Sequence, residues 1–494
     1  MLQVRNTGQG ETTMRRGSSS EMDRRGFLAL SGAAAASAML GGSASAWPGG
    51  REPPQRLKLR TPRRAKVCLV FSHIRPGQAT WPTKYYNYDA RRKELSARLR
   101  AECPGTEFTD DQVANSSADA EKIIAANPDV DGFVVMLIGI WPRAADKIMR
   151  SGKPTVVVDD LYAGSGEILG MGPAIRKENL RAALVASSNF GDVKRGVRWL
   201  ETLAAMKGAK IVNVRNSDVS GQTKLLKEVF GASMVQMNSD EMNRRYDAAD
   251  DGLARQWAVY WTKGAKKIVG VDPEEIFKAG KIHVAYMKAL EELDADAITM
   301  DCLGLYYSNK SKAYPCLSWF EMLNQGGTGI CESDVDSTAT ALLIRYLCGR
   351  PGYVSDPVIN TSKNEIIYAH CVASNRMYGP KGKANPYILR THAEDRKGVS
   401  LQSLMPLGEP ETTLRVALGD RTMVIHTGKT SENVYELEKA CRTKLAAKTD
   451  AAEILRNWTH GWHRVTVYGE WRNDFINLAQ LAGLAVIEED KRQG

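Results

Sequence analysis

The sequence has no pair of cysteines at CxxC spacing and no apolar run long enough for a strong membrane anchor. It also has no stripe of Lys and Arg interleaved with aromatic residues, so it does not carry the phosphate track of a nucleic-acid-binding protein. The 8 cysteines are scattered, mostly in apolar surroundings, which favours buried thiols over a disulfide framework. Pairing of Cys302 with Cys316, or of Cys331 with Cys371, is left open by the sequence.

Length and composition indicate a folded protein of more than one domain. A chain of 494 residues is too long for a single compact core, which predicts two or three domains. Hydrophobic residues make up 43% and charged residues 25%, as in ordinary globular proteins. Much of the net charge of +10 lies on either side of an N-terminal apolar stretch, and the rest of the chain is nearly balanced. We therefore expect no nucleic-acid partner.

Residues 1–46 have the pattern of a targeting segment. Arg24-Arg25-Gly26-Phe27-Leu28 is a twin-arginine pattern, and an Ala-rich stretch and Ser43-Ala44-Ser45-Ala46 follow it, as a signal peptidase requires. We expect a signal peptide, export to the periplasm by the twin-arginine route, and no membrane span once the leader is removed. Because that route carries folded proteins, a metal and buried thiols can be in place before export.

The rest of the chain divides by texture into a linker and three domains. A Pro- and Gly-rich linker is expected over 47–65, followed by α/β domains over 66–210 and 211–385 and a β-rich domain over 386–494. In the first two domains, short apolar runs alternate with helical patterns, one of them a long helix over about 178–207, and this alternation implies parallel sheets. The predicted fold class is α/β, with two Rossmann-like parallel-sheet domains and a β-rich C-terminal domain.

Acidic residues gather where ligands bind in such folds. Asp301 directly follows a strand predicted to end at Met300, and strand ends in parallel sheets are the usual ligand sites. Glu332, Asp334 and Asp336 then alternate ahead of a helix, where like charges repel unless a cation or a shifted pKa compensates. A solvated helix N-terminus, where acids are favoured, is the alternative interpretation.

Two histidines strengthen the case for a metal site. His370 ends an apolar strand, and His463 opens a later one, with His460 as a fallback. Carboxylates combined with one or two imidazoles suit Mn²⁺ or another divalent cation, whereas zinc favours more His and Cys. Candidates for sugar binding are an arginine after the first strand and several aromatic residues: Arg75, Trp81, Tyr85, Trp319 and Trp462.

Three stretches of the chain resemble the L-fucose/L-arabinose isomerase superfamily. They are Gly329-Ile-Cys-Glu332-Ser-Asp334-Val-Asp336-Ser, Ala369-His370-Cys371 and His463-Arg-Val-Thr-Val-Tyr-Gly469, and the resemblance extends over about residues 66–490. It implies a Mn²⁺ ion held by acids and histidine, with Glu332 or Asp334 as an acidic ligand and His370 and His463 as the imidazole ligands. It also implies a carboxylate that shuttles a proton, for which Asp301, Glu332 and Asp334 are the catalytic candidates.

The resemblance implies an exported aldose–ketose isomerase acting on a sugar or sugar derivative. Asp301 stands where the family has Glu, with Glu321 as a second candidate for that role. This departure keeps two alternatives open: a metal-dependent lyase, epimerase or hydrolase on the same scaffold, or a non-catalytic sugar-binding protein. A homo-oligomer, trimeric or hexameric, is also expected, because sites in the family borrow from neighbouring subunits.

Overall fold

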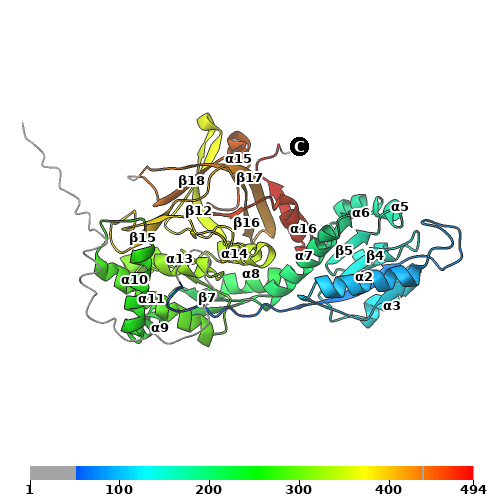
Figure 1. The fold of residues 1–494 in the computed structure, drawn as a ribbon, viewed down its shortest axis with the longest axis horizontal. Helices are drawn as coiled ribbons and strands as arrows, with labels where there is room; N and C mark the ends of the chain where they lie inside the picture. The colour runs from blue at the N-terminus through cyan, green and yellow to red at the C-terminus, as the bar shows by residue number, and fades with distance from the viewer. Residues whose placement is uncertain (1–51, 437–438, 493–494) are drawn as a thin grey trace, which may run out of the picture.

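The computed structural model describes residues 52–436 and 439–492. The predicted leader over 1–46 lies outside these residues. Within them, no helix combines the length and apolar character needed to cross a bilayer. The predicted α/β class, with parallel sheets followed by a β-rich region, is confirmed (Figure 1).

The N-terminal domain, at the right in Figure 1, is built on a parallel sheet with strand order β2-β1-β4-β5-β6, and β3 also pairs with β1. The strands are β1 (Ala65–Ser72), β2 (Thr106–Phe108), β3 (Gln112–Ala114), β4 (Gly132–Leu137), β5 (Thr155–Asp159) and β6 (Ala182–Ala186). The central strands β4 and β5 are buried along their whole length because helices cover both faces of the sheet.

Helices pack on the two faces of this sheet in separate apolar clusters. One face carries α2 (Tyr88–Glu102) and α7 (Phe190–Gly208), and the other carries α3 (Ser117–Ala126), α4 (Ala144–Met149) and α6 (Met171–Glu178). A short helix, α5 (Ser165–Ile168), precedes α6. The single helix predicted over about 178–207 is wrong, because β6 interrupts it. The small side chains of that strand, Ala-Ala-Leu-Val-Ala, resemble a helical pattern in the sequence alone.

The second domain has a parallel sheet of order β11-β10-β7-β8. Its strands are β7 (Lys210–Val214), β8 (Ser233–Met237), β10 (Ala297–Met300) and β11 (Gly329–Ile330). A small sheet of β9 (Lys267–Val269), β14 (Tyr387–Arg390) and β15 (Ser400–Ser403) lies beside it. The helices are α8 (Ser220–Phe230), α9 (Ser239–Asp247), α10 (Asp251–Gly264), α11 (Pro273–Glu292), α12 (Cys302–Tyr307), α13 (Cys316–Asn324) and α14 (Val335–Cys348).

The C-terminal region forms a closed antiparallel barrel. Its strands follow the order β16-β19-β12-β13-β18-β17, and pairing of β16 with β17 closes the ring, while β20 adds to β17. The elements are β12 (Tyr353–Asn360), η1 (Thr361–Lys363), β13 (Glu365–His370), β16 (Pro410–Ala417), β17 (Thr422–Asn433), β18 (Thr443–Lys448), α15 (Ala451–Asn457), β19 (Arg464–Tyr468), α16 (Arg472–Ala482) and β20 (Ala485–Glu488). Closure leaves the ring without open edges.

The sheets do not follow the predicted boundary between residues 385 and 386. Strands β12 and β13 precede it but pair within the barrel, whereas β14 and β15 follow it but pair with β9 of the second domain. Nearly every residue of α14 is buried, because this helix packs between the second sheet and the barrel. Its N-terminus is therefore held against the barrel.

The described part of the predicted linker lies along the second domain. Residues 52–64 form no helix or strand. Arg60 Nη1 donates to Asp296 Oδ2 at 2.9 Å, and the backbone N–H of Leu57 donates to Gln325 Oε1 at 2.6 Å. The segment that leads into β1 is therefore hydrogen-bonded to the surface of the second domain.

Candidate functional site

Two carboxylates and two imidazoles converge where the second domain meets the barrel. Glu332, Asp356, His370 and His463 each offer a donor atom, and these four atoms lie within 4.8 Å of one another. Glu332 comes from the loop between β11 and α14, whereas the other three come from or beside barrel strands β12, β13 and β19. We call these four residues the carboxylate–imidazole cluster.

The loop that carries Glu332 is held in a strained conformation. Glu332 and Ser333 have φ angles of 65° and 54°, in the left-handed region that non-glycine residues seldom adopt. The backbone N–H of Ser333 donates to Met300 O at 2.8 Å, and its hydroxyl donates to Asn213 Oδ1 at 2.7 Å. Contacts with two strands of the second sheet therefore hold Glu332 at the carboxyl edge of that sheet.

Asp334 supports the cluster from one side. Its carboxylate caps α14, accepting from the backbone N–H of Ser337 at 3.0 Å, and accepts from Arg415 Nη1 at 2.7 Å. It also lies 2.7 Å from Nδ1 of His463, so the other ring nitrogen of that histidine faces Glu332 and Asp356. This is the arrangement by which a carboxylate orients a metal-binding imidazole.

The cluster is tight inside and open at Glu332. His463 Nε2 lies 3.4 Å from Glu332 Oε2 and 3.0 Å from Asp356 Oδ1, and His370 Nε2 lies 3.6 Å from Glu332 Oε1. The side chain of His370 is 2% exposed and that of Glu332 is 33% exposed. A molecule arriving from solvent therefore meets Glu332 first.

The donor set fits a divalent cation. His370 Nε2 is buried and has no hydrogen-bond partner among the described residues, although a carboxylate faces it. Two carboxylates and two neutral imidazoles are ligands that Mn²⁺ and similar cations accept. The residues present thus suit the ion that the sequence predicts.

Electrostatics in the cluster favour charged side chains. Burial opposes ionisation of Glu332, but the adjacent imidazoles of His370 and His463, 3.6 and 3.4 Å away, outweigh it and lower the pKa of Glu332 to about 2. Burial likewise acts to lower the pKa of His463, but the hydrogen bond with Asp334 and the nearby carboxylates of Asp356 and Glu332 raise it to about 11. The pKa of His370 is also raised well above its ordinary value, against burial, by Cys371 and Glu332.

These pKa shifts predict that filling the site with Mn²⁺ near neutral pH releases about two protons, because a metal binds neutral imidazole. Both histidines have raised pKa values, so each imidazole carries an extra proton when the pH is below its pKa. Metal affinity should therefore fall as the pH falls. Calorimetry in buffers of different ionisation enthalpy counts the protons. The imidazole of His460 bonds Asp420 outside the cluster, so the control variant His460→Gln should release the same number of protons as the wild-type protein. Binding without proton release would contradict the assignment of these ligands.

Of the acids predicted as catalytic, the structure brings only Glu332 into the cluster. Asp301 caps α12, accepting from the backbone N–H of Gly304. Asp334, predicted as both ligand and catalyst, is occupied by Ser337, Arg415 and His463, so it acts on the cluster through the imidazole. Asp336 pairs with Arg415, so a guanidinium supplies part of the compensation that these acids require.

The predicted sugar-binding residues lie in different places. Trp319 is 0% exposed and stacks on Tyr286 inside the second domain, so that prediction needs correction: the ring offers no surface to a sugar. Trp462 is 63% exposed, adjoins His463 and donates to Pro357 O at 3.2 Å, which places it beside the cluster. Arg75 and Trp81 lie between β1 and α2, at the end of the molecule away from the barrel (Figure 1).

The sequence patterns did not point to Asp356. It lies in β12, in the run Tyr-Val-Ser-Asp-Pro, and its side chain is 15% exposed. An acid inside an otherwise apolar strand was the available signal, because a buried carboxylate needs a compensating partner. Pro357 directly follows Asp356, and proline is uncommon inside strands, so the segment does not stand out as a strand in the sequence.

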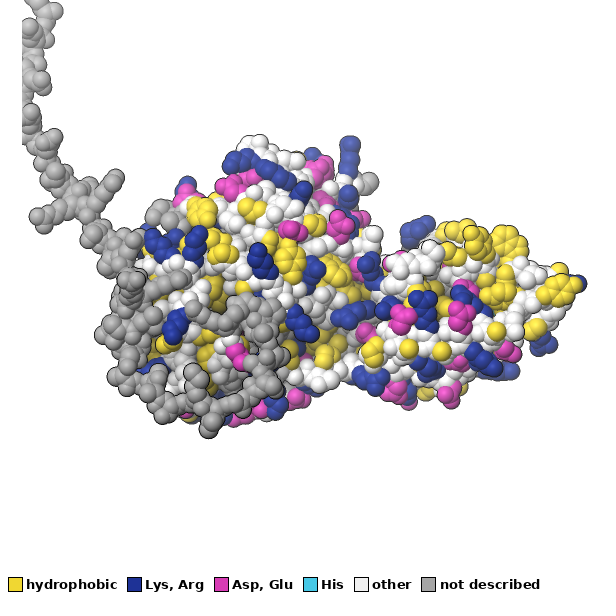
Figure 2. Space-filling model, in the orientation of Figure 1, with side chains coloured by type: hydrophobic (Ala, Val, Ile, Leu, Met, Phe, Trp, Pro, Cys, Tyr) yellow, Lys and Arg dark blue, Asp and Glu magenta, His cyan; other side chains and the backbone are white. Residues whose placement is uncertain are grey.

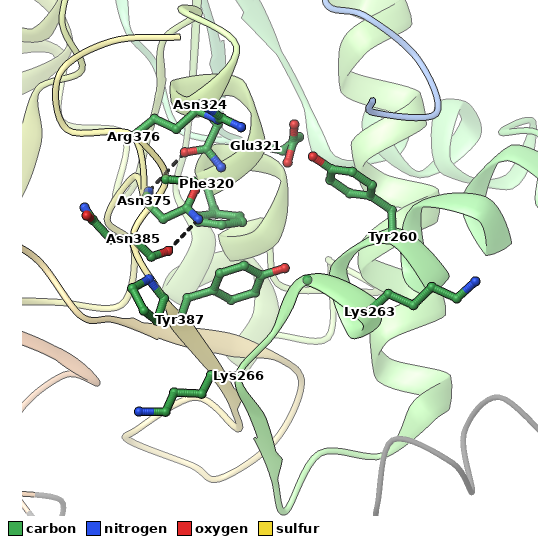
Figure 3. Close-up of a pocket in the computed structure, with 13 residues that line it drawn as sticks. Tyr260, Lys263, Lys266, Phe320, Glu321, Asn324, Asn375, Arg376, Asn385 and Tyr387 are labelled. Atoms are coloured by element: carbon green, nitrogen blue, oxygen red, sulfur yellow. Dashed lines mark hydrogen bonds between the residues drawn. The ribbon is translucent and has the colours of Figure 1, made fainter. Parts of the chain in front are cut away.

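A separate cavity of about 500 Å³ lies between α10, α13 and the segment around Asn375 (Figure 3). Glu321, the second sequence candidate for the first carboxylate, is buried in its wall and accepts from Trp261 and Gln325. Burial raises the pKa of Glu321 to about 7. Glu321 is therefore outside the carboxylate–imidazole cluster.

The fold and the cluster together define an α/β protein with a candidate divalent-metal site between its second domain and a barrel. No family model matches the chain. It is similar to the sulfoquinovose isomerases of Priestia aryabhattai and Priestia megaterium, with 23% identity over 275 residues. That alignment covers 52% of this chain and 58% of the relatives, so the chain spans a little over half of their length. The similarity supports the predicted aldose–ketose isomerase-like class of enzyme.

Proposed function

We propose that the protein is a metal-dependent aldose–ketose isomerase acting on a sugar or sugar derivative, with Mn²⁺ as its metal. The convergence of Glu332, Asp356, His370 and His463 within 4.8 Å carries this proposal. The named relatives support the same chemistry, since they are sulfoquinovose isomerases. The proposal includes export, which the twin-arginine pattern in residues 1–46 supports.

Isomerisation between neighbouring carbons needs a base and a means of stabilising negative oxygen. A bound divalent cation supplies the second, because it stabilises charge that develops on the substrate oxygens. Glu332 is ionised near neutral pH and is the most exposed member of the cluster, so it suits the role of base. Its carboxylate takes the proton from C2 of the aldose and returns it to C1, while the hydroxyl proton moves from O2 to O1.

The other residues of the site bind or orient the metal and do not take up the substrate proton. Asp356, His370 and His463 are the proposed metal ligands with Glu332, and Asp334 keeps His463 in orientation through its Nδ1. Trp462 presents an exposed apolar face next to the cluster and suits contact with a sugar ring. Because Trp462 directly precedes His463 in the chain, its ring lies close to the proposed metal site.

A homo-oligomer belongs to the same proposal. The outer end of the N-terminal domain gathers exposed apolar side chains, which Figure 2 shows at the right. Exposed large apolar side chains of this domain are Trp81 at 56%, Tyr85 at 81%, Trp141 at 53%, Tyr162 at 77% and Leu169 at 79% exposure. Such patches mark interaction sites, and the expected homo-oligomer provides a partner surface. A monodisperse monomer in light scattering would contradict this part of the proposal.

The test is incubation of the Mn²⁺-loaded protein with a panel of pentoses, hexoses and sulfoquinovose in D₂O, followed by NMR. We expect an aldose to yield its ketose with deuterium entering at C1 or C2, because a carboxylate proton exchanges with solvent. Chelation of the metal should stop both the formation of the ketose and the entry of deuterium. Glycosides in the same panel separate isomerisation from hydrolysis: release of a free sugar from a glycoside, without exchange, would favour the hydrolase alternative. Mn²⁺-loaded protein that binds a sugar without converting it would favour the binding-protein alternative.

A further inference from the structure

Behind the carboxylate–imidazole cluster lies a second group of donor atoms that is rich in sulfur. The thiols of Cys316 and Cys371 and the imidazole of His392 have donor atoms within 4.8 Å of one another, and all three residues are buried. We propose that these three residues form a second metal site, which binds one soft, thiolate-seeking cation of the Zn²⁺ or Cu⁺ class. This site is distinct from the one proposed for Mn²⁺ and does not depend on the isomerase activity.

Two members of the carboxylate–imidazole cluster have a cysteine as their neighbour in the chain. Cys331 directly precedes Glu332, and Cys371 directly follows His370. Glu332 and His370 join the half-open cluster, whereas Cys331 and Cys371 are 3% and 4% exposed in the apolar core of the second domain.

The thiol of Cys371 is not part of a disulfide with its neighbour Cys331. Sγ of Cys331 lies 3.8 Å from Sγ of Cys371, much longer than the roughly 2.05 Å of a disulfide. Cys331 falls into a separate group with His370 and Cys371, so the three ligands of the proposed site are Cys316, Cys371 and His392.

His392 is placed as a ligand rather than as a packing residue. Its Nδ1 is buried and has no hydrogen-bond partner among the residues that the structure describes. The ring stacks on Tyr314, with centroids 4.4 Å apart and planes 6° from parallel, which fixes its direction. An unpaired buried nitrogen costs free energy unless an ion or a donor satisfies it.

The donor types separate the two sites by metal. The set of Cys316, Cys371 and His392 contains no carboxylate, so it disfavours Mn²⁺ and favours soft cations. His370 touches both sites, with Nε2 3.6 Å from Glu332 Oε1 and Nδ1 3.5 Å from Sγ of Cys371. An ion on Cys371 therefore lies next to the imidazole that the first site uses.

The test uses Co²⁺ as a probe on the full chain, kept reduced, stripped of metal and then given an excess of Mn²⁺. We expect about one equivalent of Co²⁺ to produce thiolate-to-cobalt charge-transfer absorption, which carboxylate and imidazole ligands do not give. Titration with Zn²⁺, and separately with Cu⁺ under anaerobic conditions, should abolish the band and show which cation binds more tightly. Cys316→Ala and His392→Phe should lose the band, and Cys68→Ala, a buried thiol in the N-terminal sheet, should keep it.

Absence of the band from the wild-type protein, with all thiols reduced, would overturn the proposal. Survival of the band in both Cys316→Ala and His392→Phe would also overturn it. Circular dichroism checks that each variant is folded, and Cys316→Ser replaces Cys316→Ala if the latter is not. None of these readouts involves sugar turnover, so failure here and failure of the isomerase proposal are separate results.

Discussion

Glu332→Gln is expected to lower the rate of aldose–ketose interconversion by about 10²–10⁴-fold, the usual contribution of a positioned general base. The amide keeps the size of the side chain but cannot accept the proton from C2. It also removes a negative charge that faces both His370 and His463, so Mn²⁺ affinity should fall as well. Initial rates at saturating metal, with metal content measured separately, divide the two effects.

The matched control for Glu332→Gln is Asp301→Asn. Asp301 caps α12, and asparagine caps a helix about as well as aspartate, so turnover and stability should change little. The sequence alone made Asp301 a candidate base. If Asp301→Asn were as damaging as Glu332→Gln while the protein stayed folded, the catalytic role would move to Asp301. If neither change lowered turnover, the proposed site would be wrong.

Arg464→Met is expected to destabilise the barrel by about 3–5 kcal/mol, the usual cost of removing one partner from a buried ion pair. Arg464 and Glu489 are both 0% exposed. Arg464 Nη2 lies 2.5 Å from Glu489 Oε1, and Nε lies 3.1 Å from Oε2. The only other side chain described at that carboxylate is His426, whose Nδ1 lies 2.9 Å from Oε2. Without Arg464, Glu489 keeps a buried charge with too little compensation.

Urea unfolding followed by circular dichroism measures the effect of Arg464→Met. The control is Arg456→Met, which breaks an exposed pair with Glu453 within a helix and should cost no more than about 1 kcal/mol. The double change Arg464→Met with Glu489→Leu should recover part of the loss, because it removes the orphaned charge. An equal, small effect of the two single changes would contradict a structural role for the buried pair.

Much of the sheet architecture could be predicted because its signals are local. The apolar runs of β1, β4 and β5 stand out, since strands buried on both faces carry few polar residues. The strand β6 was missed because its small side chains fit a helix equally well. The assignment of β12 and β13 to the barrel could not be predicted, because pairing between distant strands leaves no mark within either strand.

The candidate site was predictable in part for the same reason. Glu332, His370 and His463 each occupy a chemically unusual place in their own segment, next to a strand end or a helix start. Asp356 has no such neighbourhood, and Trp319 has a conspicuous aromatic side chain that is buried in the core. Whether a side chain faces a site or a core depends on which elements pack against it, and composition does not show that.

The sequence by itself determined the α/β class, the alternation of strands and helices, and the types of ligand available, because backbone preferences and burial patterns act over a few residues. Only the tertiary structure decided that Glu332, Asp356, His370 and His463 meet, and that Asp334 holds an imidazole instead of joining them. These residues span more than a hundred positions of the chain. Their meeting depends on the packing of α14 between the second sheet and a closed barrel, which no short segment encodes.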